Sequence, residues 1–149
     1  MGEYRTVLVA EDEPDDAFLI GRALHDVGVI NPVQAVVDGA QAICYLTGEG
    51  KFADRSAYPF PGLFLLDLKM PKLDGLDVLR WLKQNPSVRQ SLVVVVISSS
   101  LPARAIETAH NLGVDLLMEK PVRYADLQER MRLIKARWLN RDYLPAQAR

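Results

Sequence analysis

The sequence is poor in the residues that build disulfide frameworks, zinc sites and membrane spans. Its 149 residues include a single cysteine, Cys44, and two histidines, so an intrachain disulfide is impossible and a His/Cys metal centre is not expected. No stretch approaches the roughly 18 consecutive apolar residues that span a membrane, and the first residues carry no apolar signal-peptide core. These absences favour a cytoplasmic protein that does not enter a membrane.

The sequence also has no marked excess of positive or negative charge. The 18 Lys and Arg residues nearly balance the 19 Asp and Glu residues, which leaves a formal net charge of −1. Because non-specific nucleic-acid binding depends on basic surfaces, nucleic acid is not an expected partner. The length and the apolar fraction of 49% are typical of one ordinary globular domain.

Short apolar runs alternate with stretches of helical periodicity along the chain. The runs predict strands at residues 6–10, 33–37, 63–66, 92–97 and 114–118, with helices at 15–27, 40–46, 75–84, 102–112 and 126–138. Residues 48–62 are polar and are expected to form a long loop. This alternation predicts a doubly wound α/β fold, a five-stranded parallel sheet with helices on both faces. Right-handed crossovers then bring the carboxyl ends of all strands to one edge.

Charged or hydroxyl side chains follow four of these strands. Glu11 and Asp12 follow the first, Asp67 the third, Ser98 the fourth and Lys120 the fifth. A carboxylate directly after a buried strand is costly unless something uses it, and ligand sites of open parallel sheets lie at this edge. We therefore expect the five side chains to converge, with Ser99 as the reserve candidate for the hydroxyl position.

The expected cluster suits phosphoryl chemistry with magnesium. Three carboxylates repel one another unless a cation joins them, and Mg²⁺ prefers oxygen ligands. A lysine and a hydroxyl beside these acids supply the donors that stabilise a transferring phosphoryl group. Asp67 then acts as the nucleophile that forms an aspartyl phosphate.

These residues, in this order, resemble the receiver domains of two-component response regulators. The resemblance runs from about residue 6 to 138 and rests on the acidic pair, Asp67, Asp74-Gly75, Ser98 and Lys120-Pro121. It implies the flavodoxin-like strand order 2-1-3-4-5. It also implies phosphoryl transfer to Asp67 from a phosphohistidine on a sensor histidine kinase.

Roles for single residues follow from the same resemblance. It implies that Glu11, Asp12 and Asp67 bind Mg²⁺ together with the backbone carbonyl of Lys69. It implies that Ser98 and Lys120 contact the phosphoryl group, and that a cis bond is common at the position of Lys120-Pro121. Such a protein is not an ordinary enzyme, although it assists its own phosphorylation and dephosphorylation.

One departure from the family stands three residues before Lys120. Many receivers have an aromatic switch residue there, whereas this sequence has Leu117. An inward-swinging aromatic ring is therefore not expected in this chain.

The long loop at residues 48–62 and the tail at residues 138–145 are additions that look similar to those of single-domain regulators that partner bacterial phytochrome kinases. We expect residues 1–149 to form one receiver domain, with a core at about 5–138 and a C-terminal extension at 139–149 that supports homodimers. The expected partners are a sensor histidine kinase, of the bacteriophytochrome type, and either a downstream target or a histidine phosphotransfer protein.

Two other functions remain open from the sequence. A haloacid-dehalogenase-type phosphohydrolase also uses an aspartate nucleophile, Mg²⁺, Ser/Thr and Lys, but its nucleophile follows the first strand in an Asp-x-Asp pattern. Here that strand ends in Glu11-Asp12-Glu13, with Glu13 read as a helix-start acid. A pseudo-receiver that only binds partners is the other alternative, against which stands the retention of every phosphorylation residue type.

Overall fold

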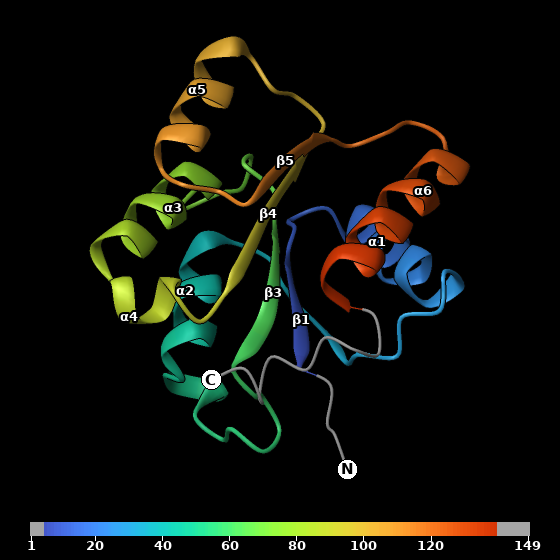
Figure 1. Cartoon of the computed structure of the whole chain (residues 1–149). Helices are drawn as coiled ribbons and strands as arrows, with labels where there is room; N and C mark the ends of the chain where they lie inside the picture. Colours follow the sequence, from blue (N-terminus) through green and yellow to red (C-terminus); the bar gives the residue numbers. More distant parts are fainter. Residues whose placement is uncertain (1–4, 140–149) are drawn as a thin grey trace.

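The computed structural model describes residues 5–139 and has a central five-stranded parallel sheet between two layers of helices (Figure 1). The strands are β1 Thr6–Ala10, β2 Val33–Val36, β3 Pro61–Leu66, β4 Val93–Ser98 and β5 Leu116–Glu119. The helices are α1 Pro14–Asp26, α2 Gly39–Thr47, α3 Gly75–Gln84, α4 Pro86–Arg89, α5 Ala103–Asn111 and α6 Tyr124–Ile134. The strand order is β2-β1-β3-β4-β5, which confirms the predicted flavodoxin-like fold.

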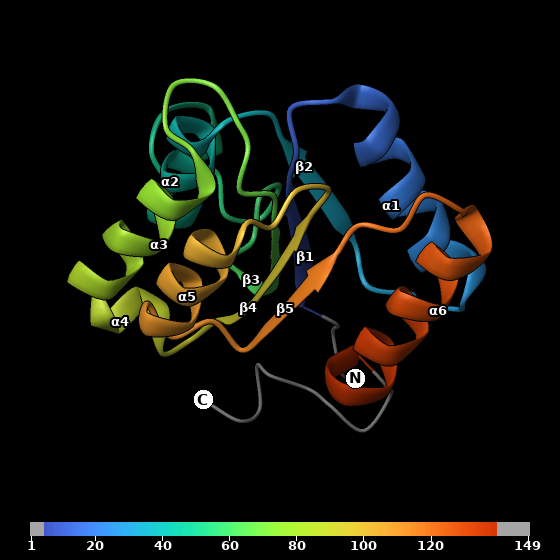
Figure 2. The same cartoon turned by 90° about the horizontal axis from the view of Figure 1, so that it is seen from above.

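Alternate residues of each central strand enter two separate apolar cores. Val7 and Val9 of β1 pack in the core beneath α1 and α6, whereas Leu8 and Ala10 pack in the core beneath α2, α3 and α5. Figure 2 shows the same division, with α1 and α6 on one side of the sheet and α2, α3 and α5 on the other. The sheet is therefore covered on both faces, as the continuous apolar strands predict.

The segment at residues 48–62 differs from the predicted polar loop. It contains a 3₁₀ turn, η1 Gly50–Phe52, and its last two residues already belong to β3. The ring centroids of Phe52 and Tyr58 lie 5.2 Å apart, and that of Tyr45 on α2 lies 5.0 Å from Phe52. This aromatic cluster holds the segment against α2. The polar composition of the segment does not reveal these contacts.

The last helix is also longer at its beginning than predicted. α6 starts at Tyr124 and continues through a π-helical turn, η2 Lys135–Leu139. Leu139 is buried in the core shared by α1 and α6. The remainder of the predicted extension, residues 140–149, lies outside the described residues. Within residues 5–139, no helix is both long and apolar enough to cross a membrane.

Candidate functional site

The carboxyl edge of the sheet carries the predicted site residues. Backbone hydrogen bonds continue one residue past the ends of the strands and so fix the backbone positions of three site residues. The three bonds are Glu11 N–H to Val36 O at 3.0 Å, Asp67 N–H to Ala10 O at 3.1 Å and Lys120 N–H to Ser98 O at 2.8 Å. Residues far apart in sequence are thus held side by side by the sheet itself.

Asp67 lies at the centre of the cluster and is almost fully buried. Its Oδ1 accepts hydrogen bonds from the Ser98 hydroxyl at 2.8 Å and from the Lys69 backbone N–H at 3.0 Å. Its Oδ2 accepts from Lys120 Nζ at 3.2 Å. Ser98 is fully buried against the carboxylate whereas Ser99 is exposed, so the geometry favours Ser98 for the hydroxyl position.

Lys120 joins three carboxylates. Its Nζ lies 2.5 Å from Glu11 Oε1, 3.1 Å from Asp16 Oδ2 and 3.2 Å from Asp67 Oδ2. Asp16 was not among the predicted site residues. Asp16 lies in the first turn of α1, where negative charge stabilises the helix N-terminus, so an acidic residue is expected there without any role in the site. Nothing in the sequence indicates that it contacts Lys120.

Glu11, Asp12 and Asp67 form a group of oxygen donors that fits a hard divalent cation. One carboxylate oxygen from each lies within 4.8 Å of the other two. Glu13 is exposed at the N-cap of α1, and its backbone N–H donates to Glu11 Oε2 at 3.1 Å. Glu13 therefore helps to orient Glu11, in agreement with its reading as a helix-start acid.

Burial and hydrogen bonding shift the pKa values of the two buried acids, Glu11 and Asp67, in opposite directions. Burial raises the pKa of Glu11 to about 7, although the hydrogen bond from Lys120 opposes this. Burial acts in the same direction on Asp67, but hydrogen bonds from Glu11, the Lys69 amide and Ser98 outweigh it and leave the Asp67 pKa below its ordinary value. Asp67 is thus the more acidic of the two buried carboxyl groups.

The Lys120 ammonium remains charged in this setting. Burial acts to lower its pKa, but the hydrogen bond that Lys120 donates to Glu11 and the charges of Asp67 and Glu11 raise the pKa above its ordinary value. A fixed positive charge therefore stands 3.2 Å from the Asp67 carboxylate.

The loop after β3 is packed tightly beneath the site. A Cβ atom on Gly75 would stand 2.5 Å from the Asp67 carbonyl oxygen, so a side chain is excluded there. Asp74 caps α3 by accepting from the Asp77 N–H, and the Asp77 side chain accepts in return from the Asp74 N–H. The predicted Asp74-Gly75 turn thus anchors the loop that carries Lys69.

Three further expectations concern the Lys120-Pro121 bond, Leu117 and Lys69. The described residues contain no cis peptide bond, so the Lys120-Pro121 bond is trans, unlike the form common in the family. Leu117 is half-buried in β5 and packs against the core beneath α2, α3 and α5. The Lys69 side chain is exposed, and the metal-binding role of its carbonyl stays a prediction.

A parallel sheet of this order, with an acid cluster, a hydroxyl and a lysine at its carboxyl edge, is the arrangement expected of a receiver domain. The family model for the response regulator receiver domain matches residues 7–132. The chain belongs to this family.

Its relatives include regulators of light signalling. Response regulator Rcp1 of Synechocystis is 30% identical over 95% of this chain and 94% of its own length. The response regulator RPA3017 "in red light signaling of R. palustris" is 38% identical, with a TM-score of 0.84 over 91% of this chain and 94% of its own. The phosphorylated cyanobacterial phytochrome response regulator RcpA is 33% identical, with a TM-score of 0.83 over 92% and 95%. Members of this family are signalling proteins and not ordinary enzymes.

Proposed function

We propose that this chain is a response regulator that receives a phosphoryl group on Asp67 from a sensor histidine kinase. The contacts of Asp67 carry the proposal, because one carboxylate meets a buried hydroxyl, a lysine ammonium and two further acids. Cations and donors placed where charge gathers are what phosphoryl transfer requires.

The proposed reaction is a displacement at phosphorus. An Asp67 Oδ atom forms a bond to the phosphorus of the donor phosphohistidine, and the phosphorus–nitrogen bond breaks with its electron pair left on the imidazole. Lys120 and Ser98, which contact the Asp67 carboxylate, would donate hydrogen bonds to the phosphoryl oxygens. Dephosphorylation is the attack of water on the same phosphorus, a reaction that the chain assists with the same donors.

We propose Glu11, Asp12 and Asp67 as the residues that hold Mg²⁺, with the Lys69 backbone carbonyl as a further ligand. Bound there, the ion would supply positive charge to the phosphoryl oxygens. The oxygen-only donor set supports this choice. So does the Mn²⁺-bound form of Rcp1, which matches 95% of this chain with a TM-score of 0.82 and 30% identity.

The relatives suggest the partners. Because RcpA is a phytochrome response regulator and RPA3017 acts in red light signalling, we propose a bacteriophytochrome histidine kinase as the donor, in the cytoplasm. The phosphorylated chain would act on a target protein or pass its phosphoryl group to a histidine phosphotransfer protein. We also propose that the chain forms a homodimer and that it does not bind nucleic acid.

Acetyl phosphate with Mg²⁺ provides the first test. Intact-mass spectrometry should show one added phosphoryl group on the wild-type chain and none on Asp67→Asn, since the amide cannot form the acyl phosphate. EDTA should abolish the addition in the wild type. Asp54→Asn is the matched control, because it removes an exposed acid outside the site.

The control should be phosphorylated like the wild type. Addition that persists in Asp67→Asn, or that never occurs with acetyl phosphate or a kinase, would contradict the proposal. Steady release of phosphate from a small phosphoester, without an accumulated adduct, would favour a hydrolase instead.

A further inference from the structure

All hydrogen-bond donors of Lys120 are engaged in the structure. An ammonium has three N–H donors and no acceptor. The three acceptors of Lys120 are Glu11, Asp16 and Asp67, at 2.5, 3.1 and 3.2 Å from Nζ. A phosphoryl oxygen on Asp67 therefore has no Lys120 donor to itself until one of these contacts is given up.

Asp16 is the acceptor that Lys120 can lose at the lowest cost. Its side chain is 38% exposed, whereas those of Glu11 and Asp67 are 1% and 7% exposed. Water can solvate Asp16 once the ammonium leaves, but the two buried carboxylates would lose a partner that water does not replace. Exposed ion pairs are also the weaker ones.

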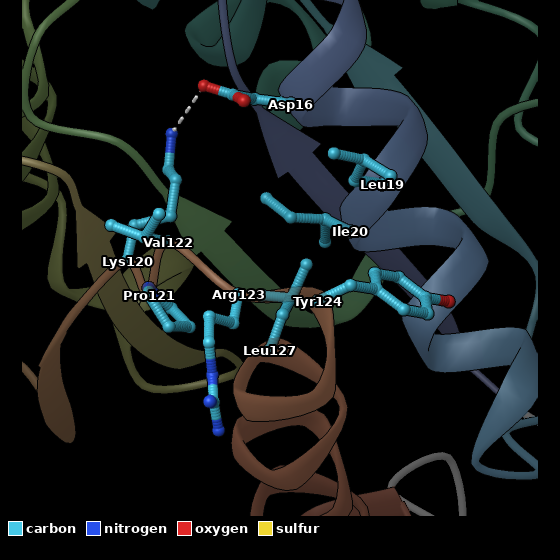
Figure 3. Close-up of a pocket in the computed structure, with 9 residues that line it drawn as sticks. All are labelled: Asp16, Leu19, Ile20, Lys120, Pro121, Val122, Arg123, Tyr124 and Leu127. Carbon is cyan, nitrogen blue, oxygen red and sulfur yellow. Dashed lines mark hydrogen bonds and ion pairs between the residues drawn. The ribbon is translucent and has the colours of Figure 1, made fainter.

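The space around the pair allows this exchange. A cavity of about 110 Å³ lies between α1 and the segment that follows β5. Figure 3 shows the Lys120–Asp16 contact at one end of it, with the side chains of Leu19 and Ile20 along α1. Both charged side chains can thus change rotamer without disturbing a close-packed core.

We infer that Asp16 is a positioning residue for phosphoryl transfer, which holds the third donor of Lys120 in the free protein and releases it to the phosphoryl group on Asp67. The inference rests on the proposed function. It gives α1 a charged contact that exists only in the unphosphorylated state.

The rate of phosphorylation by acetyl phosphate in saturating Mg²⁺ tests the inference. Asp16→Asn should react about threefold faster than the wild type, because the neutral amide oxygen holds the ammonium less strongly. Asp15→Asn is the matched control. It removes the same charge from the same helical turn, and no hydrogen bond or ion pair joins it to Lys120 in the described structure. It should react at the wild-type rate.

The nitrogen resonance of the Lys120 side chain provides a readout that a general charge effect would not move. In the free protein, this resonance should differ between the wild type and Asp16→Asn but not between the wild type and Asp15→Asn. With beryllofluoride and Mg²⁺ as a phosphoryl mimic, the difference should vanish, since Lys120 no longer contacts residue 16.

The outcomes separate the two proposals. Equal rates for Asp16→Asn and Asp15→Asn, or a Lys120 difference that persists with beryllofluoride, would overturn the role of Asp16 while the phosphoacceptor site stands. A wild-type chain that is never phosphorylated but shows the free-state Lys120 difference would overturn the proposed function instead.

Discussion

The buried carboxyl side chains at the sheet edge lower the stability of the free protein, because they bring negative charges close together. Glu11 is 2% exposed and lies beside the Asp67 carboxylate in the same buried cluster. Two acids in such a place cannot both ionise without cost, and Lys120 compensates only part of it. A bound cation would remove the remaining conflict, so the free protein should be less stable than its packing allows.

Glu11→Gln should therefore stabilise the metal-free protein at high pH. The Glu11 pKa rises from 4.5 to about 7 on folding, so the folded chain binds more protons than the unfolded chain between these values. Its stability then falls as pH rises through this window, and the loss is complete above about pH 7. Glutamine does not ionise, so its gain should reach about 2 kcal/mol at pH 8 and shrink toward pH 5.

Urea unfolding in EDTA from pH 5 to 8 measures this gain. Glu13→Gln is the control, because it removes an exposed acid two residues away and should show no gain that grows with pH. Added Mg²⁺ should stabilise the wild type and reverse the order of the two proteins. A Glu11→Gln variant that is less stable than the wild type at pH 8 would contradict the charge conflict.

The site residues that directly follow a strand could be predicted from the sequence, because the strand ends determine where these residues lie. Glu11, Asp67 and Lys120 each follow a strand, and parallel strands bring their ends together. Asp16 follows no strand. Its contact with Lys120 depends on how the first turn of α1 packs beside the end of β5, and no local pattern in the sequence records that packing.

Among the elements, the β3–α3 connection is the most constrained. Gly75 starts α3 with no room for a Cβ atom, and the capping box of Asp74 and Asp77 fixes the same turn. The loop that carries Lys69 is thereby tied to the helix that follows it. The same glycine is not in the left-handed region, so its requirement is the close approach of the Asp67 backbone.

Gly75→Ala should destabilise the fold by about 1–3 kcal/mol, since the added methyl group forces the backbone beneath Asp67 to shift. Gly21→Ala is the matched substitution. Gly21 lies inside α1 with open space around the added Cβ, and alanine there should stabilise by about 0.5–1 kcal/mol. Chemical unfolding of both variants measures the contrast, and equal effects would refute the steric explanation.

Elements were predictable where apolar periodicity is strong. Strand β4 was expected from its continuous β-branched run and is buried along nearly all its length. The turn η1 and the short helix α4 were missed, because both occur in segments rich in polar residues, Gly or Pro. The turn η1 is stabilised by the aromatic contacts of Phe52 with Tyr45 and Tyr58, which apolar periodicity does not reveal.

In the whole molecule, the turn η2 that follows α6 is part of the domain core. Leu139 is 6% exposed and belongs to the same core as Met131 and Ile134. A truncation that tests the proposed role of the extension in pairing must therefore retain this residue. This core covers the α1–α6 face of the sheet.

The proposed homodimer can be tested with a chain that ends at residue 139. Light scattering should give a dimer for the full chain and a monomer for the shortened chain, because the extension supplies the pairing surface. Circular dichroism should be the same for both, which controls for loss of the fold. A shortened chain that still pairs would place the interface elsewhere, and a monomeric full chain would exclude the proposed dimer.

The proposed function requires that Asp67 itself carries the phosphoryl group. Borohydride reduction of the protein after reaction with phosphorylated kinase converts an acyl phosphate to an alcohol, and peptide mass spectrometry then locates the altered side chain. We expect that Asp67 alone is reduced, and only when Mg²⁺ is present. Reduction at another carboxylate, or none at residue 67 in a chain that has gained the phosphoryl mass, would contradict it.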